Sequence, residues 1–161
     1  VYSGQGKSKV CLLVLTERTT RDEHVIKMEN RKIESTIKAL DHLEKLMGYR
    51  KFKKCSKTIT MDNGAEFLDP VNIERSCICK KPRTVAYYCH PYNSSERGSN
   101  ENANRLIRRF IPKGEDISKY TKEQITEITN WMNNYPRRLF KGKSANEIKE
   151  TLGIKNALPQ V

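Results

Sequence analysis

Apolar residues at the start of the chain form short runs typical of β-strands. Residues 10–16 are almost continuously apolar, which predicts a strand buried on both faces. Gly4 and Gly6 precede this run and predict a tight reversal after an earlier strand, while residues 24–28 have the pattern of a further strand. A meander of three strands is therefore expected to open the chain.

The apolar spacing then changes to intervals of three and four residues, which predicts an amphipathic helix over 33–47. Asn30 is the expected N-cap and Gly48 the expected C-terminal stop. Residues 49–57 are rich in Lys and Arg and are interpreted as a basic connection. Three further segments follow, namely strands at 57–61 and 84–89 and a short helix within 69–76.

Helical patterns dominate after Pro91. One apolar face extends over residues 103–111, and two capping boxes, Thr121-x-x-Gln124 and Ser144-x-x-Glu147, predict the starts of two more helices. The order of strands and helices predicts a single α/β domain, with a mixed sheet packed by helices.

Charge and composition narrow the possible functions. The 161 residues include 31 Lys or Arg and 19 Asp or Glu, a formal net charge of +12. No apolar run approaches the roughly 20 residues of a membrane helix, so no membrane partner is expected. A basic domain of this kind most often binds a polyanion, and nucleic acid is the first candidate because phosphate contacts release counterions.

The five cysteines are an odd set and a poor disulfide framework, which indicates a reducing compartment. Cys77, Cys79, Cys89 and His90 offer four zinc ligands, but Cys-x-Cys lacks the usual spacing, so buried free thiols are favoured over a zinc site. The chain begins at Val1 without a targeting pattern and is interpreted as an internal piece of a cytoplasmic protein.

Two acidic residues are candidates for chemistry. Asp62 ends a predicted strand, where ligands bind in open α/β sheets, although Asp62-Asn63-Gly64 is also ordinary turn chemistry. Glu101 lies in the first turn of a predicted helix, on the same side as Arg105 and Arg108. The alternative for Glu101 is a helix-dipole contact with an i,i+4 pair to Arg105.

Together these segments resemble the catalytic core of Asp-Asp-Glu transposases and retroviral integrases, and most closely bacterial insertion-sequence transposases of the IS-thirty family. The stretches that carry the resemblance are 12–18, Ile59-Thr60-Met61-Asp62-Asn63-Gly64-Ala65-Glu66-Phe67, 90–102, 106–114 and 133–138. The resemblance covers nearly the whole chain in the same order. It implies a ribonuclease-H-like fold with a mixed five-stranded sheet flanked by helices, and one catalytic core over residues 1–161.

The resemblance implies that Asp62 and Glu101 are the second and third acidic residues of a catalytic and metal-binding triad. Two Mg²⁺ or Mn²⁺ ions would serve phosphoryl transfer that cleaves transposon ends and joins them to target DNA. The first aspartate is missing, since no Asp precedes Asp22. It is expected just upstream of Val1, which would leave this fragment inactive and its first strand truncated. A helix-turn-helix region is expected outside the chain.

Further expectations concern DNA contacts and individual side chains. Arg97, Arg105, Arg108 and Lys113 are candidate DNA contacts, and a basic group at 50–54 is either a DNA contact or a solvated surface. His90 is a loop histidine or a neighbour of the metals, Glu17 an exposed ion pair, and Trp131 a core residue. The resemblance also implies a nucleoid-associated bacterial protein and a homo-oligomer on DNA. The alternative function is a non-catalytic nucleic-acid-binding domain of the same fold.

Overall fold

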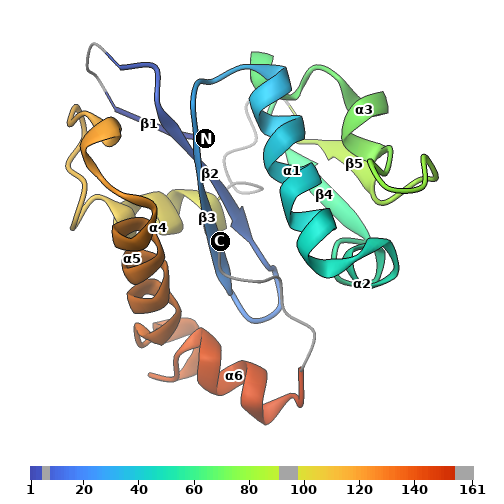
Figure 1. Cartoon of the computed structure of the whole chain (residues 1–161). Coiled ribbons are helices and arrows are strands. Elements are labelled where there is room, and N and C mark those ends of the chain that lie inside the picture. Colours follow the sequence, from blue (N-terminus) through green and yellow to red (C-terminus); the bar gives the residue numbers. More distant parts are fainter. Residues whose placement is uncertain (5–7, 91–97, 155–161) are drawn as a thin grey trace.

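The computed structural model describes residues 1–4, 8–90 and 98–154, and its α/β architecture is shown in Figure 1. The strands are β1 (Tyr2–Ser3), β2 (Cys11–Thr16), β3 (Glu23–Met28), β4 (Thr58–Met61) and β5 (Val85–Tyr88). The helices are α1 (Ile33–Met47), α2 (Tyr49–Cys55), α3 (Pro70–Glu74), α4 (Gly98–Ile107), α5 (Lys122–Asn134) and α6 (Ala145–Thr151). None of the described helices has both the length and the apolar character needed to cross a bilayer.

The strands form two sheets, so the single five-stranded mixed sheet is not confirmed. β1, β2 and β3 are antiparallel neighbours, as the expected meander requires, whereas β4 and β5 form a separate parallel pair. The physical reason lies in β1, which is two residues long and pairs with β2 only at Leu12 and Cys11. It is too short to bridge the rest of β2 to β4.

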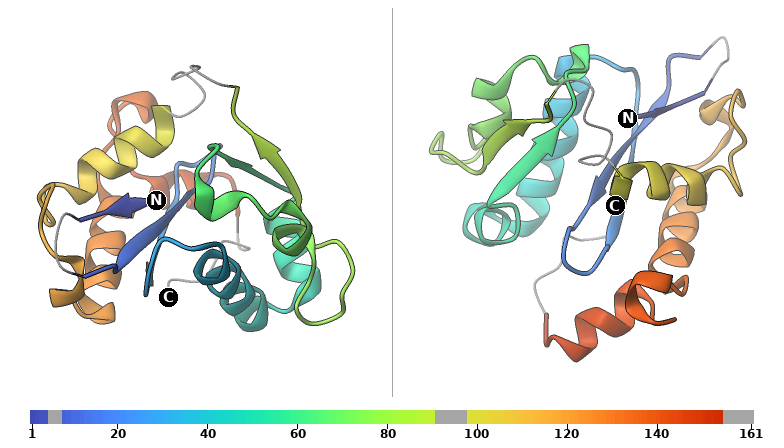
Figure 2. Two further views of the ribbon diagram at one scale, coloured as in Figure 1. Left: turned by 90° about the horizontal axis from the view of Figure 1, so that it is seen from above. Right: turned by 180° about the vertical axis from the view of Figure 1, so that it is seen from behind.

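Two apolar cores lie on opposite faces of the first sheet (Figure 2). Alternate residues of β2 serve different cores: Leu12 and Val14 pack with α4 and α5, while Cys11 and Leu13 pack with α1 and the β4 region. This arrangement confirms that the apolar run at 10–16 is buried on both faces, because side chains alternate along a strand. The first sheet is therefore the central layer between two groups of helices.

The predicted basic connection at 49–57 is wrong, because most of it is α2. Gly48 ends α1 with a φ of 76°, as expected, but the chain starts α2 at once. Phe52 is buried and fixes α2 against the core, while its Lys and Arg residues, which are good helix formers, face solvent. The hydrophobic pattern of seven residues was too short to predict this helix.

The N-caps predicted for the last two helices are observed, whereas the N-cap predicted for α1 is not. Both predicted capping boxes are confirmed, at Thr121 for α5 and at Ser144 for α6. The N-cap of α1 is Lys32 and not Asn30, because the helix begins later and the Asn30 Oδ1 accepts a hydrogen bond from the Ser35 hydroxyl. The short helix expected within 69–76 is confirmed as α3.

A buried ion cluster joins α1 to the segment before β5. Arg83 is fully buried, and its Nη1 lies 2.5 Å from Asp41 Oδ1 and 2.9 Å from Glu44 Oε2. Its Nε also donates to the carbonyl of Ile73 at 2.8 Å. Glu44 accepts further bonds from the Ser76 hydroxyl and the Cys77 amide. The cluster fixes the β4–β5 pair against α1 and so positions the end of β4.

Candidate metal and nucleic-acid site

A cleft of about 600 Å³ lies between the first sheet and β4. It is lined by residues from β2, β4, α1, α2 and the first turn of α4, together with Val1. Asp62, Ser99 and Asn100 all line this cleft. The structure thus brings one predicted acidic residue and the start of the predicted α4 helix to the same cavity.

Asp62 follows the last residue of β4, so its carboxylate is placed by the end of a strand. The Cys89 amide donates to the Met61 carbonyl at 2.8 Å, which extends the β4–β5 pairing to this point. The Gly64 amide donates to Asp62 Oδ1 at 3.2 Å, and the Asn63 side chain donates to the Cys89 carbonyl at 3.3 Å. The turn interpretation of this motif is therefore correct, and the turn also holds the carboxylate at the cleft.

Glu101 occupies the first turn of α4 and is exposed. It follows Asn100, which lines the cleft, but Glu101 is not among the lining residues. Arg105 donates from Nη2 to Asn102 Oδ1 at 2.8 Å, so its partner on the same helix is Asn102. Glu101 therefore directly follows a residue that lines the cleft, while its own side chain is exposed to solvent.

Hydrogen bonds fasten the first turn of α4 to the β2–β3 hairpin. Thr16 Oγ1 contacts Asn100 Oδ1 at 3.0 Å and donates to Glu23 Oε2 at 2.6 Å. Arg21 donates to the Ser99 hydroxyl at 2.5 Å. Burial of Glu23 raises its pKa to about 7, because the hydrogen bond from Thr16 and the charge of Arg137 only partly offset the loss of solvent. This network was not predicted, since its members are far apart in sequence.

Charged side chains form the wall at the hairpin end of the cleft. Buried Asp22 lies 3.0 Å from His24 Nε2 and 2.7 Å from the Lys149 ammonium of α6. Burial favours the neutral form of Asp22, but its bonds to His24 and Lys149 together lower its pKa. No ion pair of Glu17 is found within the described ranges, and its carboxylate accepts bonds from the amides of Thr19 and Thr20. These contacts stabilise the β2–β3 turn.

A second carboxylate lies beside Asp62. Glu66, in the 3-10 turn Ala65–Phe67, is 1% exposed, and its Oε1 accepts from Arg31 Nε at 2.7 Å. Its Oε2 is buried and meets no hydrogen-bond donor in the described part of the chain. Carboxylate oxygens are the ligands that Mg²⁺ and Mn²⁺ prefer, so Asp62 with this unsatisfied oxygen fits a divalent cation. Glu66 lies in one of the stretches that carry the resemblance, but no role was predicted for it.

The predicted DNA contacts are only partly described. Arg105, Arg108 and Lys113 are exposed on α4 and just after it, while Arg97 lies outside the described residues. His90 is exposed after β5. Trp131 packs partly buried against the core, with ring centroids 4.8 Å from both Phe110 and Tyr135, in agreement with a core position.

The zinc quartet does not assemble. Across 1–4, 8–90 and 98–154, three possible metal ligands come together only at Asp41, Glu44 and Cys77, where Arg83 already pairs with both carboxylates. The cysteines are free thiols, and Cys11 and Cys89 are buried. Burial raises the pKa of the Cys11 thiol to about 11, so it is protonated at neutral pH.

Sequence comparison relates the chain to transposases. It is 37% identical over 143 residues to the transposase for insertion sequence element IS4351 of Bacteroides fragilis, and 33% identical over 150 residues to a probable transposase for IS1161 of Streptococcus salivarius. It is also 29% identical over 150 residues to transposase InsI of IS30A from Escherichia coli. No protein-family model matches.

These alignments cover 88% to 93% of this chain. They cover 36% to 41% of the relatives, so the chain spans about two fifths of their length. The chain is therefore homologous, over most of its own length, to insertion-sequence transposases that include members of the IS30 family.

Proposed function

We propose that the chain is the catalytic core of a DNA transposase with a ribonuclease-H-like fold. It would act in metal-dependent phosphoryl transfer, cleaving transposon ends and joining them to target DNA. The observation that carries this proposal is the cleft, which is lined both by Asp62 at the end of β4 and by the first turn of α4. Homology to insertion-sequence transposases supports the same function.

Asp62 and Glu101 are the proposed metal ligands. Asp62 presents its carboxylate from a turn, and Glu101 is one residue beyond Asn100, which Thr16 holds at the cleft. Two Mg²⁺ or Mn²⁺ ions, when bound, would activate the attacking hydroxyl and stabilise the leaving oxygen. Glu101 is exposed, so we propose that its side chain turns toward the cleft when the metal binds.

A third carboxylate is proposed from polypeptide preceding Val1. The resemblance places the first aspartate there, and Val1 lines the same cleft as Asp62. A carboxylate carried next to Val1 would therefore reach the metal site. On this proposal the chain as given is inactive, the helix-turn-helix region lies elsewhere in the parent transposase, and DNA ends are joined by an assembly of two or more copies.

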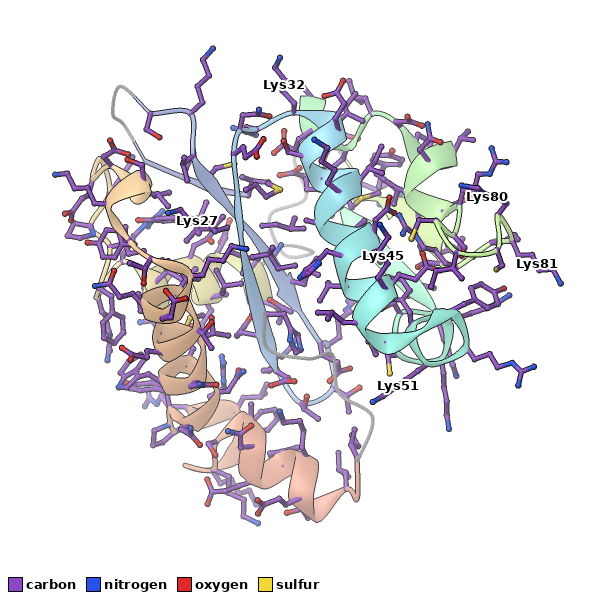
Figure 3. All side chains as sticks on the ribbon, viewed as in Figure 1. Lys27, Lys32, Lys45, Lys51, Lys80 and Lys81 are labelled. Carbon is purple, nitrogen blue, oxygen red and sulfur yellow. The ribbon has the colours of Figure 1, made fainter. Side chains whose placement is uncertain are left out.

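Basic side chains support DNA as the partner. Arg105 is exposed on α4, which carries the proposed ligand Glu101, and Arg108 is exposed directly after that helix. A second basic surface covers α1, α2 and the connection from α3 to β5, where Figure 3 labels Lys45, Lys51, Lys80 and Lys81. We propose that α4 guides the scissile phosphates and that the second surface adds nonspecific affinity, which counterion release makes steeply salt-dependent.

The test uses the full-length parent transposase with Asp62→Asn or Glu101→Gln. Each substitution should abolish strand transfer and leave DNA binding within about threefold, because one metal-binding oxygen is lost while the basic surface is intact. Glu127→Gln, on the exposed side of α5, is the matched control and should keep full activity. Strand transfer by Asp62→Asn at the wild-type rate would refute the proposal. Loss of DNA binding together with activity would favour the non-catalytic alternative.

A further inference from the structure

Glu66 is a buried charged residue with one unsatisfied oxygen. Its side chain is 1% exposed, and Arg31 Nε occupies Oε1 at 2.7 Å. No donor in the described part of the chain contacts Oε2. A buried carboxylate oxygen without a partner is costly, because it has lost water and gained nothing in exchange. An ion pair formed only for stability would be expected to satisfy both oxygens.

The position of Oε2 is defined by Gly64. A Cβ added to Gly64 would lie 2.7 Å from Glu66 Oε2 and 2.9 Å from Asp62 Oδ1. The backbone of Gly64, at φ −65° and ψ 145°, is open to any residue, so conformation does not require glycine here. Glycine is required here by lack of space, because both carboxylates lie next to the place where a side chain would stand.

Two carboxylates this close repel each other when both are ionised. Arg31 relieves part of this repulsion. The pKa of Arg31 is raised by its hydrogen bond to Glu66 and by the charge of Asp62, while burial acts in the opposite direction. The Arg31 side chain is 51% exposed and contacts Oε1, so it gives no hydrogen bond to Oε2. A hydrated divalent ion at Asp62 would supply a donor to Oε2 and further positive charge between the two carboxylates.

We propose that Glu66 is a positioning residue of the divalent-cation site at Asp62. Its Oε2 accepts a hydrogen bond from water in the hydration shell of the cation, while Oε1 accepts its bond from Arg31. Mg²⁺ keeps several of its waters in proteins, and acceptors for them tune affinity. The inference rests on the proposed function, since it presupposes a cation at Asp62, and it adds a carboxylate that the Asp-Asp-Glu assignment does not contain.

The experiment measures Mn²⁺ binding to this chain by electron paramagnetic resonance of free Mn²⁺, so no DNA or activity is needed. Glu66→Gln keeps the size of the side chain and removes its charge, and it should weaken binding 10- to 100-fold. Gly64→Ala should also weaken binding, because its methyl group displaces one of the two carboxylates. Glu127→Gln, which removes the same charge on α5, should bind as the wild type does.

Arg31→Gln separates a metal role from a structural one. If the Arg31–Glu66 pair only stabilises the fold, both partners' variants should change Mn²⁺ affinity equally and melt at similarly lowered temperatures. The proposal expects Arg31→Gln to keep Mn²⁺ affinity within about threefold while Glu66→Gln loses it. Circular dichroism establishes that each variant is folded. If Glu66→Gln does not fold, Gly64→Ala provides the test in its place.

The outcomes distinguish this inference from the proposed function. If Asp62→Asn weakens Mn²⁺ binding while Glu66→Gln and Gly64→Ala match the wild type, the role of Glu66 is overturned and the metal site stands. If the wild type binds no Mn²⁺ at millimolar concentration, or Asp62→Asn leaves binding unchanged, the site at Asp62 is overturned and Glu66 with it.

Discussion

Removing the buried Arg83 guanidinium should cost more stability than any surface substitution. Arg83→Met keeps most of the apolar stem but removes the guanidinium, whose Cζ lies 5.7 Å from the centroid of the Phe52 ring. It deletes the donors to Asp41 and Glu44 and leaves Glu44, which is 0% exposed, without its counter-ion. Breaking one side of a buried ion pair costs about 3–5 kcal/mol, because the remaining charge is uncompensated.

That loss is a large fraction of the roughly 5–15 kcal/mol by which domains are stable. In a domain of this size it should lower the melting temperature by roughly 10 °C. Urea unfolding followed by circular dichroism gives the free energy directly. Arg75→Met, an exposed residue nearby, is the control and should stay within about 0.5 kcal/mol of the wild type.

A double substitution refines the test. Arg83→Met combined with Glu44→Gln removes both charges and should recover part of the loss, since no unpaired ion is left in the core. The reasoning is refuted if Arg83→Met alone costs less than about 1 kcal/mol. It is also refuted if the double variant is as unstable as the sum of the two single variants.

Three further predictions concern caps, pH and the core. Ser144→Ala should cost about 1 kcal/mol in urea unfolding, because it removes half of the α6 capping box; a cost near zero would show that α6 is held by tertiary contacts instead. Burial raises the pKa of Glu23 to about 7 from 4.5, so its contribution to stability is full below 4.5 and is lost as pH rises through 7. Unfolding at pH 5 and pH 8 should therefore show wild type losing stability relative to Glu23→Gln, and an equal difference at both pH values would contradict this sign. Leu43→Ala should cost about 2–5 kcal/mol by leaving a cavity, with exposed Leu46→Ala as its nearly neutral control.

Much of the fold could be predicted from the local sequence. The apolar run at 10–16, the helix spacing over 33–47 and both capping boxes depend on neighbours in the chain, and all have counterparts in the structure. The errors arose where the answer depends on distant contacts. α2 forms because Phe52 finds a core pocket, and the sheets stay separate because β1 is short.

The candidate site shows the same division. The position of Asp62 at the end of a strand could be predicted from its local pattern. The expectation that Asp62 lies near the start of α4 came from the resemblance. The partners of Glu66 and Thr16 could not be predicted, because Arg31 is 35 residues from Glu66 and Asn100 is 84 residues from Thr16. Burial of Glu66 was also invisible, since a carboxylate in a polar motif normally indicates exposure.

The separation of the two sheets has a consequence for how the protein behaves at high concentration. Along the cleft, β2 beyond Leu12 and β4 opposite β5 present backbone groups that pair with no other strand in the described ranges. Open strand edges of this kind are templates for any extended peptide. A strand of the same polypeptide that paired with both β2 and β4 would close both edges at once. With the cleft open, copies of the chain are expected to aggregate by edge-to-edge pairing.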